Sequence, residues 1–317
     1  MKSRLILITA VMALSAPFAY AQEPATSQPA SATADKPQTV TAEYPDLASA
    51  GLTYACLADL PDGVLLAAGG VSLKREDLEA EIMKTPQALQ DQLHKNSFFL
   101  LEQMATRQLL LQEAKAAAAK DGKDALAPPE KELFQTYFDN LTAGAKVSDE
   151  EIADFYAKNK DMVGDQALEA VKDAIGKYLL QQKQQEIVDR HIRTLGERIT
   201  IQLAAPWVKQ QAVLAKDNPV DKVRGSGKPS LVDFGSKGCR PCDMLAPILE
   251  TLKKKYDGRA NVIFVSAPGE QILAARYGIQ SIPVQIFYDA GGKEVFRHVG
   301  FWPQEELEKK LAELGVK

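Results

Sequence analysis

Two cysteines, Cys239 and Cys242, lie three positions apart and directly follow the apolar segment 230–235. This order predicts a strand that delivers the first cysteine to the opening turn of a helix. Free N–H groups and the helix dipole stabilise an anion there, so Cys239 should be a reactive thiolate. Cys242 can then attack a mixed disulfide at Cys239 and close an intramolecular disulfide. The pattern therefore predicts thiol–disulfide exchange, with Cys239 as nucleophile and Cys242 as resolving cysteine.

Two other uses of a cysteine pair compete with redox chemistry, namely a structural disulfide and half of a zinc site. Zinc would need further Cys or His residues at ligand spacing. The three histidines, His94, His191 and His298, are scattered along the chain. We therefore favour redox activity and expect neither a metal nor another cofactor.

The residues around the cysteine pair resemble those of the thioredoxin family. Asp233 matches the family's buried acid, and Pro247 matches the proline inside the helix that follows the cysteines. The segment 277–283, which ends in Ser-Ile-Pro, is similar to the family's cis-proline loop, and Gly300 matches the glycine near the last strand. The resemblance covers residues 228–317.

This resemblance implies a role for each matched residue. Asp233 would assist proton transfer, and Pro283 would be cis and would shape the edge that binds substrate. Gly300 would let a bound peptide approach. The residues beside the cysteines and the cis-proline complete the expected substrate-binding set, namely Arg240, Pro241 and Ile282.

The sequence departs from the thioredoxin pattern at three positions. Gly238 stands where the family usually has Trp, Arg240 replaces the common Gly between the cysteines, and Phe264 lies where many thioredoxins carry a Lys near the buried acid. Arg240 adds positive charge beside Cys239, which favours its thiolate. These changes leave the exchange chemistry intact, and they leave open whether the pair acts as reductase, oxidase or isomerase.

The resemblance implies an α/β domain of the thioredoxin-like fold, and hydrophobic patterning agrees with it, because the pattern fits a mixed sheet with helices on both faces. Apolar runs and period-two alternation predict strands, and 3.6-residue periodicity predicts helices. The expected strands span 230–235, 261–266, 284–288 and 294–299, and the expected helices span 239–256, 270–277 and 303–314.

The first 21 residues have the features of a secretory signal peptide. Residues 1–4 are basic, residues 5–19 form an apolar core too short to span a bilayer, and residues 19–21 form a small-x-small cleavage site. We therefore expect export to the periplasm, where disulfide chemistry is common. Residues 22–46 are rich in Ala, Pro and Thr, which predicts a flexible linker.

Residues 47–203 carry apolar side chains mostly at helical spacing, with a short strand and turn expected at 64–77. We expect a mostly α-helical domain here and a linker over 204–227. Ser148 and Glu151 form a capping box that predicts a helix start.

The order of these helices resembles the chaperone module of the SurA and parvulin family of periplasmic folding factors. That family usually inserts a prolyl-isomerase domain after the helix that begins near 148, and this chain has no room for it. The resemblance implies a helical module that binds client protein or forms a homodimer.

These observations predict an exported thiol–disulfide oxidoreductase that acts on cysteines of unfolded or folding proteins and is recycled by a redox partner protein. One alternative is a holdase chaperone whose thioredoxin-like domain mainly docks partners, and another is a reductase dedicated to a single partner. The net charge of -4 argues against general nucleic-acid binding, and no later segment is apolar enough for an integral membrane protein. Cys56 can be a buried free thiol or can form an intermolecular disulfide, and we favour the buried thiol.

Overall fold

A computed structural model describes residues 38–45, 47–48, 51–120, 128–158 and 166–317. The expected signal peptide and most of the expected linker at 22–46 lie outside the described residues. The described end of that linker contains a short helix, α2 (Val40–Glu43), in which Val40 is fully buried. This end of the linker therefore packs against the folded protein.

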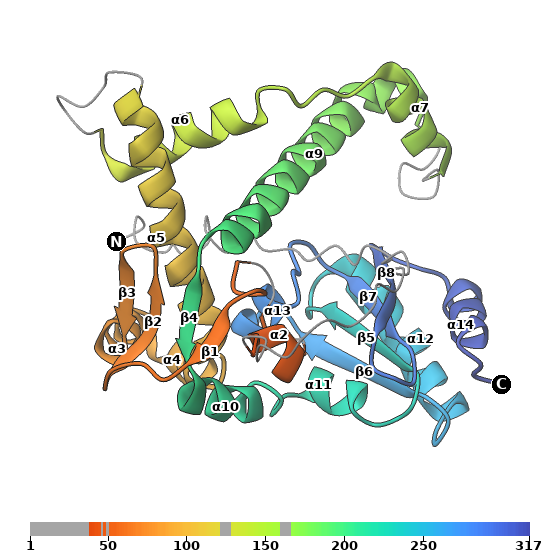
Figure 1. Cartoon of the computed structure of the whole chain (residues 1–317). Coiled ribbons are helices and arrows are strands. Elements are labelled where there is room, and N and C mark those ends of the chain that lie inside the picture. Colours follow the sequence, from red (N-terminus) through yellow and green to blue (C-terminus); the bar gives the residue numbers. More distant parts are fainter. Residues whose placement is uncertain (1–37, 46, 49–50, 121–127, 159–165) are drawn as a thin grey trace, which may run out of the picture.

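The C-terminal part of the chain forms a four-stranded mixed sheet in the order β6-β5-β7-β8 (Figure 1). Strand β5 is parallel to β6 and antiparallel to β7, and β7 is antiparallel to β8. The bounds confirm all four expected strands: β5 (Ser230–Gly235), β6 (Asn261–Ser266), β7 (Val284–Tyr288) and β8 (Glu294–Val299). The three expected helices are also present, as α12 (Arg240–Lys255), α13 (Gln271–Arg276) and α14 (Gln304–Glu313). The thioredoxin-like fold is thereby confirmed.

Helices cover both faces of this sheet, which explains why every residue of β5 is buried. Side chains alternate between the two faces of a strand. Leu231 packs against Leu245 of α12 and Leu307 of α14 on one face. Val232 packs on the opposite face, in the cluster that holds Leu273 of α13. Asp233 therefore shares the face of Leu231, beneath the helix that carries the cysteines.

The N-terminal part is mostly helical, as expected. Its helices are α3 (Arg75–Met83), α4 (Gln87–Lys95), α5 (Ser97–Lys120), α6 (Glu130–Thr142), α7 (Asp149–Lys158) and α9 (Leu168–Arg198). The expected capping box precedes α7, where the Ser148 N–H donates to Glu151 Oε2 at 2.8 Å and the Glu151 N–H donates to Ser148 Oγ at 3.2 Å. A search of the described residues finds no helix with the length and apolar character of a membrane span.

A second four-stranded sheet in the N-terminal part goes beyond the short strand expected at 64–77. Its strands are β1 (Cys56–Ala58), β2 (Val64–Ala68), β3 (Val71–Lys74) and β4 (Ile201–Ala204), in the order β1-β4-β2-β3. Strand β4 pairs with β1 and β2 from beyond the whole helical segment. Strands of three to five residues are too short to show a clear alternation of apolar and polar residues. Pairing between distant segments leaves no periodic pattern at all, so the sequence analysis missed this sheet.

Residues 204–227, which we expected to be a linker, contain two helices, α10 (Ala205–Leu214) and α11 (Pro219–Arg224). Asn218 begins α11, since its side chain accepts hydrogen bonds from the N–H groups of Val220 and Asp221. Val220 is fully buried in the core of the C-terminal sheet. The start of the C-terminal domain at 228 stays a prediction, although α11 already packs against that domain.

The two parts of the chain contact each other through α4 and α13. Gln92 of α4 donates from Nε2 to the Gly269 carbonyl at 2.8 Å and accepts from the Ile272 N–H at 3.2 Å. The side chain of Ile272 joins the hydrophobic core of the N-terminal part. Because α13 leads directly into residues 277–283, the N-terminal part supports the loop that carries Pro283.

Candidate active site

The cysteine pair lies at the N-terminus of α12, as the sequence predicts. Cys239 is the residue that caps the helix, and Cys242 lies in its first turn. The two form a disulfide with their Cα atoms 5.2 Å apart. Cys242 is buried, whereas Cys239 is half-buried and Arg240 is exposed. An incoming sulfur can therefore reach Cys239 more readily than Cys242.

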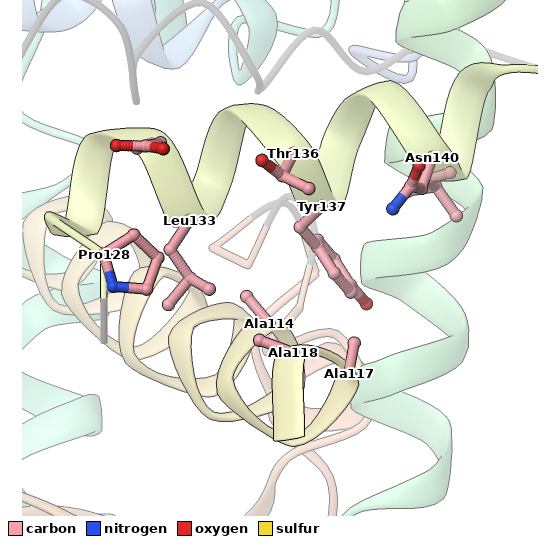
Figure 2. A pocket seen from close by; sticks show the side chains of 10 residues that line it. Ala114, Ala117, Ala118, Pro128, Leu133, Thr136, Tyr137 and Asn140 are labelled. Atoms are coloured by element: carbon pink, nitrogen blue, oxygen red, sulfur yellow. The ribbon is translucent and has the colours of Figure 1, made fainter. Parts of the chain in front are cut away.

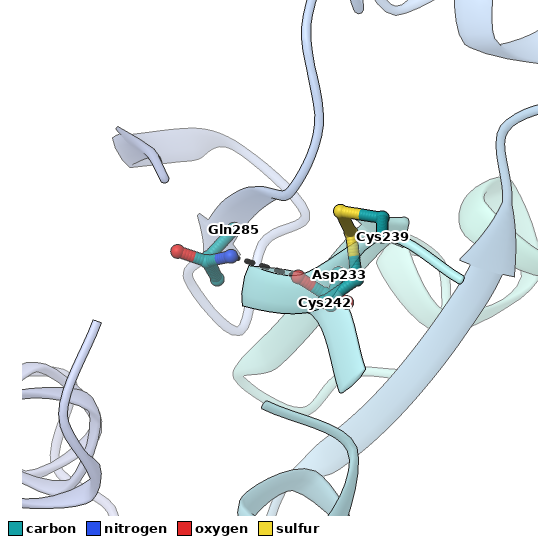
Figure 3. The surroundings of a disulfide bond; sticks show 4 residues. All are labelled: Asp233, Cys239, Cys242 and Gln285. Carbon is teal, nitrogen blue, oxygen red and sulfur yellow. Dashed lines mark hydrogen bonds between the residues drawn. A yellow bond between two sulfur atoms is a disulfide. The ribbon is translucent and has the colours of Figure 1, made fainter. Parts of the chain in front are cut away.

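Asp233 lies in the sheet beneath the disulfide and is 1% exposed. Burial raises the pKa of its carboxyl to about 6, and a hydrogen bond from Gln285 acts in the opposite direction. Gln285 donates from Nε2 to Asp233 Oδ1 at 2.8 Å, and Oδ2 has no hydrogen-bond partner (Figure 3). This carboxyl can therefore take up or release a proton near neutral pH.

Gly235 allows the carboxyl and the second cysteine to come close together. A Cβ atom at Gly235 would lie 3.4 Å from Asp233 Oδ2 and 3.4 Å from Cys242 Cβ. It would also lie 2.9 Å from Cε2 of Phe264, the residue that pairs with Asp233 in the parallel register of β5 and β6. The unpartnered oxygen of Asp233 and the resolving cysteine therefore both lie next to Gly235, and the Phe264 ring lies beside them.

The expected cis-proline is confirmed, because the Ile282–Pro283 bond is cis. Phe234 pairs with Val284, so Pro283 lies at the same end of the sheet from which the chain leaves β5 toward Cys239. Gly300 donates its N–H to the Pro283 carbonyl at 2.8 Å, which places the two residues side by side. A Cβ at Gly300 would have no atom within 4 Å, although its φ of +101° favours glycine.

The remaining predicted substrate-binding residues lie near the same end of the sheet. Pro241 is in the opening turn of α12 and is half-buried, as is Ile282 before the cis bond. Roles in substrate binding for Arg240, Pro241, Ile282 and Gly300 stay predictions.

Sequence analysis missed Gln285. It is fully buried and is the polar member of the strand Val-Gln-Ile-Phe-Tyr. A polar residue inside an otherwise apolar strand is the signal that could have found it, because buried polar groups need partners.

The other cysteine and the histidine of the helical part lie outside this site. Cys56 is a free thiol in β1 and is half-buried, so it is less buried than we expected. His191 of α9 shares a 2.8 Å hydrogen bond between its Nε2 and the hydroxyl of Tyr137. Across the residues that the structure describes, no three His, Cys, Asp or Glu side chains group as metal ligands do.

Comparison with known proteins places the site in a family. The profile of the thioredoxin-like domain matches residues 217–315. The thioredoxin of Staphylococcus epidermidis is 38% identical over 99 residues, which are 31% of this chain and 93% of that protein. Thioredoxin 2 of Chlorobaculum tepidum is 38% identical over 92 residues, or 29% of this chain and 84% of its own length.

Among solved structures, a thioredoxin variant from Halobacterium salinarum is 28% identical, covers 31% of this chain and 83% of its own, and has a TM-score of 0.28. The residues that the profile matches include the cysteine pair, the buried aspartate and the cis-proline. Through this C-terminal part, the chain belongs to the thioredoxin-like family of thiol–disulfide oxidoreductases.

Proposed function

We infer that this chain is an exported thiol–disulfide oxidoreductase whose Cys-Arg-Pro-Cys motif acts on cysteines of protein substrates. The observation that carries this inference is the position of Cys239 and Cys242 at the N-terminus of α12, directly above a buried carboxyl with a free oxygen. A purely structural disulfide needs neither the helix N-terminus nor the carboxyl.

The reduction of a substrate disulfide follows from this geometry. The Cys239 thiolate attacks one substrate sulfur, forms a mixed disulfide and expels the other substrate sulfur as a thiolate, which takes up a proton. Cys242 then loses its proton to Asp233 and attacks Cys239. The Cys239–Cys242 bond forms, and the second substrate sulfur leaves. Two electrons pass from the cysteine pair to the substrate, and the reverse sequence oxidises a dithiol.

Trapping of the mixed disulfide tests this function. In a Cys242→Ser variant the second attack is lost, so substrate proteins should accumulate covalently on Cys239 and be released by reductant. A Cys239→Ser variant, with Cys242 buried, should accumulate few such adducts. Non-reducing electrophoresis of the two full-length variants distinguishes them, and equal adducts would contradict the assigned roles.

The reduction potential of the pair sets the direction of the reaction. A value near the roughly -270 mV of thioredoxin would favour a reductase, whereas a value near roughly -120 mV would favour an oxidant. Equilibration of the full-length protein with glutathione buffers, followed by alkylation, gives this value.

We assign client binding or dimerisation to the helical arm formed by α6, α7 and α9, in keeping with its SurA-like order of helices. Helix α9 has 31 residues and so extends about 45 Å. Helix α7 packs against its far end (Figure 1).

Apolar surfaces at and beside this arm support the assignment. A cavity of about 590 Å³ lies between α5 and α6 and is lined largely by small and apolar side chains (Figure 2). Tyr178 of α9 is 43% exposed and packs against Phe155 of α7. Exposed apolar groups of this kind can bind the apolar side chains of an unfolded protein.

The holdase alternative can be tested in the full chain without redox chemistry. A Cys239→Ser/Cys242→Ser variant should suppress the aggregation of an unfolded protein that lacks cysteine, as followed by light scattering. Tyr178→Asp in that background should weaken suppression. Met83→Asp, at an exposed apolar residue of α3 outside the arm, is the matched control. If the arm variant behaves like the control, dimerisation becomes the better role, and the solution mass of the full chain tests it.

Export is tested by the mature N-terminus. Cleavage after Ala21 removes the first 21 residues, so the protein recovered from the periplasm should begin at Gln22. Recovery of the chain with Met1 intact would contradict the proposal.

A further inference from the structure

A buried glutamine interrupts the apolar interior of the C-terminal sheet. Gln285 is fully buried in β7 between Val284 and Ile286. Burial of an amide costs free energy unless it forms hydrogen bonds. Its Nε2 donates to Asp233 Oδ1 at 2.8 Å, whereas its Oε1 has no partner. The bond to Asp233 is therefore the interaction that offsets the burial of this amide.

The same bond determines which oxygen of Asp233 is free. Oδ1 is held from β7, and Figure 3 shows the Gln285 amide approaching the carboxyl from the side away from the disulfide. Oδ2 has no hydrogen-bond partner. Both Oδ2 and Cys242 Cβ would lie 3.4 Å from a Cβ atom placed on Gly235, so the carboxylate oxygen and the cysteine are close to the same point. Rotation of the carboxyl would break the bond to Gln285, so the bond keeps the free oxygen beside Cys242.

We propose that Gln285 is a positioning residue for Asp233, whose amide holds Oδ1 so that Oδ2 accepts the proton of Cys242 during resolution. The proposal rests on the thiol–disulfide exchange inferred above. In that step the S–H bond of Cys242 breaks, the proton passes to Oδ2, and the new thiolate attacks Cys239. A hydrogen bond donated to a carboxylate stabilises the charged form, so Gln285 also keeps the acceptor ionised at lower pH.

Few other charged or titratable groups face Asp233. Helix α12 contributes Cys242 itself, while Asp243 beside it is exposed. Strand β6 contributes the uncharged Phe264. Strand β8 contributes His298, which pairs with Gln285 in the register, stacks on Trp302, and has its pKa lowered by burial. The amide of Gln285 is thus the polar contact that opposes the effect of burial on this carboxyl.

The test resolves attack and resolution in one experiment. Reduced full-length protein, in a Cys56→Ser background, is mixed with an aromatic disulfide whose thiolate absorbs visible light. The first thiolate released reports attack by Cys239, and the second reports resolution by Cys242. Stopped-flow traces are recorded from pH 5 to pH 8 for the parent, Gln285→Met, Asp233→Asn and the double variant. Met preserves the length of the side chain and removes the donor.

Gln285→Met should shift the pH dependence of the second release upward by about one unit, which slows it up to roughly tenfold below pH 6. The first release should be unchanged, and Gln285→Met should add nothing once Asp233 is Asn. An unshifted profile, or an equal slowing at every pH and in both backgrounds, would overturn the proposal. Gln211→Met, at another buried glutamine with an unpartnered Oε1, is the matched control and should leave the profile unchanged.

A direct titration separates this proposal from the proposed function. Carboxyl ¹³C shifts of the oxidised protein report the pKa of Asp233 without any turnover. The pKa should rise in Gln285→Met, and in Gln285→Leu if Met is not accommodated. An unchanged pKa would overturn the positioning role even if exchange is observed. Failure of Cys242→Ser to trap substrate would instead contradict the proposed function and leave the titration result standing.

Discussion

Two aspartates of the C-terminal part, Asp221 and Asp233, are both shielded from solvent but have opposite surroundings. Asp221 accepts hydrogen bonds from the Tyr277 hydroxyl at 2.8 Å, from Arg276 at 3.0 Å and from Arg224 at 3.2 Å. Asp233 accepts one hydrogen bond, from a neutral amide, and keeps one oxygen without a partner. They also lie on opposite sides of the sheet, since Tyr277 packs in the cluster of Val232.

The difference shows that its surroundings decide whether a buried aspartate stabilises the fold or exchanges a proton. Several charged donors around one carboxylate fix its position. Arg276 also donates to the Ala215 carbonyl after α10, so the Asp221 cluster ties α10, α11 and α13 together. Burial without a cation instead brings the pKa of Asp233 to about 6, where a proton can move in either direction. We therefore expect Asp221 to control stability and Asp233 to control chemistry.

The largest expected effect is that of Asp221→Ala on stability. The substitution leaves Arg224 and Arg276, whose side chains are 14% and 10% exposed, without their shared carboxylate. Buried charges that lose their partner destabilise a protein by about 3–5 kcal/mol. Urea unfolding of the full chain should show a loss of this size, while the folded protein keeps its rate of thiol exchange.

Asp217→Ala is the matched control for this comparison. Asp217 lies in the same segment and pairs with Lys222 at 2.6 Å, but its side chain is 57% exposed. Removal of this exposed pair should leave the free energy of unfolding nearly unchanged, because water screens the attraction between the two charges. Equal effects of the two substitutions would mean that the Asp221 cluster does not hold the helices together.

Asp233→Asn should have a smaller effect on the free energy of unfolding. The effect depends on pH and is stabilising rather than destabilising. The pKa of Asp233 is about 6 in the folded protein, whereas the ordinary value of an aspartate carboxyl, 3.8, applies to the unfolded chain. Well below pH 3.8 the carboxyl is neutral in both states and costs nothing. As pH rises from about 4 through 6, the wild-type protein loses about 2–3 kcal/mol of stability, because the unfolded chain ionises first and the folded protein must then bury the charge.

The Asn variant has no such charge to bury, so its stability relative to wild type should rise by this amount between pH 4 and pH 7. Urea unfolding of both oxidised proteins at the two pH values measures the change, and any constant packing cost of Asn cancels. A difference independent of pH would show that Asp233 does not titrate in this range.

The sequence predicted the redox site well because its signals are local. Cys239 and Cys242 lie three positions apart at a strand-to-helix junction, and the apolar strands around them are long enough to show their pattern. Asp233 and Pro283 were found through their resemblance to a known motif. Each of these signals lies within a short stretch of chain, so no knowledge of distant pairing was needed.

The features that sequence analysis missed depend on contacts between distant segments. Asp221 was not singled out, because its partners Arg276 and Tyr277 lie more than 50 positions away. Strand β4 pairs with β1 and β2 across the whole helical part. Gln92 contacts the C-terminal part from a position that shows only helical periodicity. Polar contacts of this kind leave no periodic trace in the sequence.

The smallest expected effect comes from Phe264→Lys, which would bring a cation to Asp233 and so make it more like Asp221. The Phe264 ring reaches the point beside Gly235 that also borders Asp233 Oδ2, and the residue is 49% exposed. A lysine there can bury its stem and keep its ammonium in water, so the free energy of unfolding should change by less than about 1 kcal/mol. The nearby positive charge should lower the pKa of Asp233 by about half a unit to one unit.

Phe264→Gln separates this charge effect from the loss of the ring, because glutamine is uncharged and also opens the carboxyl to water. The ¹³C titration of Asp233 should therefore show a larger downward shift for Lys than for Gln, and the excess should shrink in 1 M salt, where the screening length is about 3 Å. Because stability is lost between the unfolded and the folded pKa, a lower folded pKa also reduces the total stability that the Lys variant loses as pH rises. Equal shifts in the two variants would mean that the ring acts by excluding water, and that one added cation does not make Asp233 resemble Asp221.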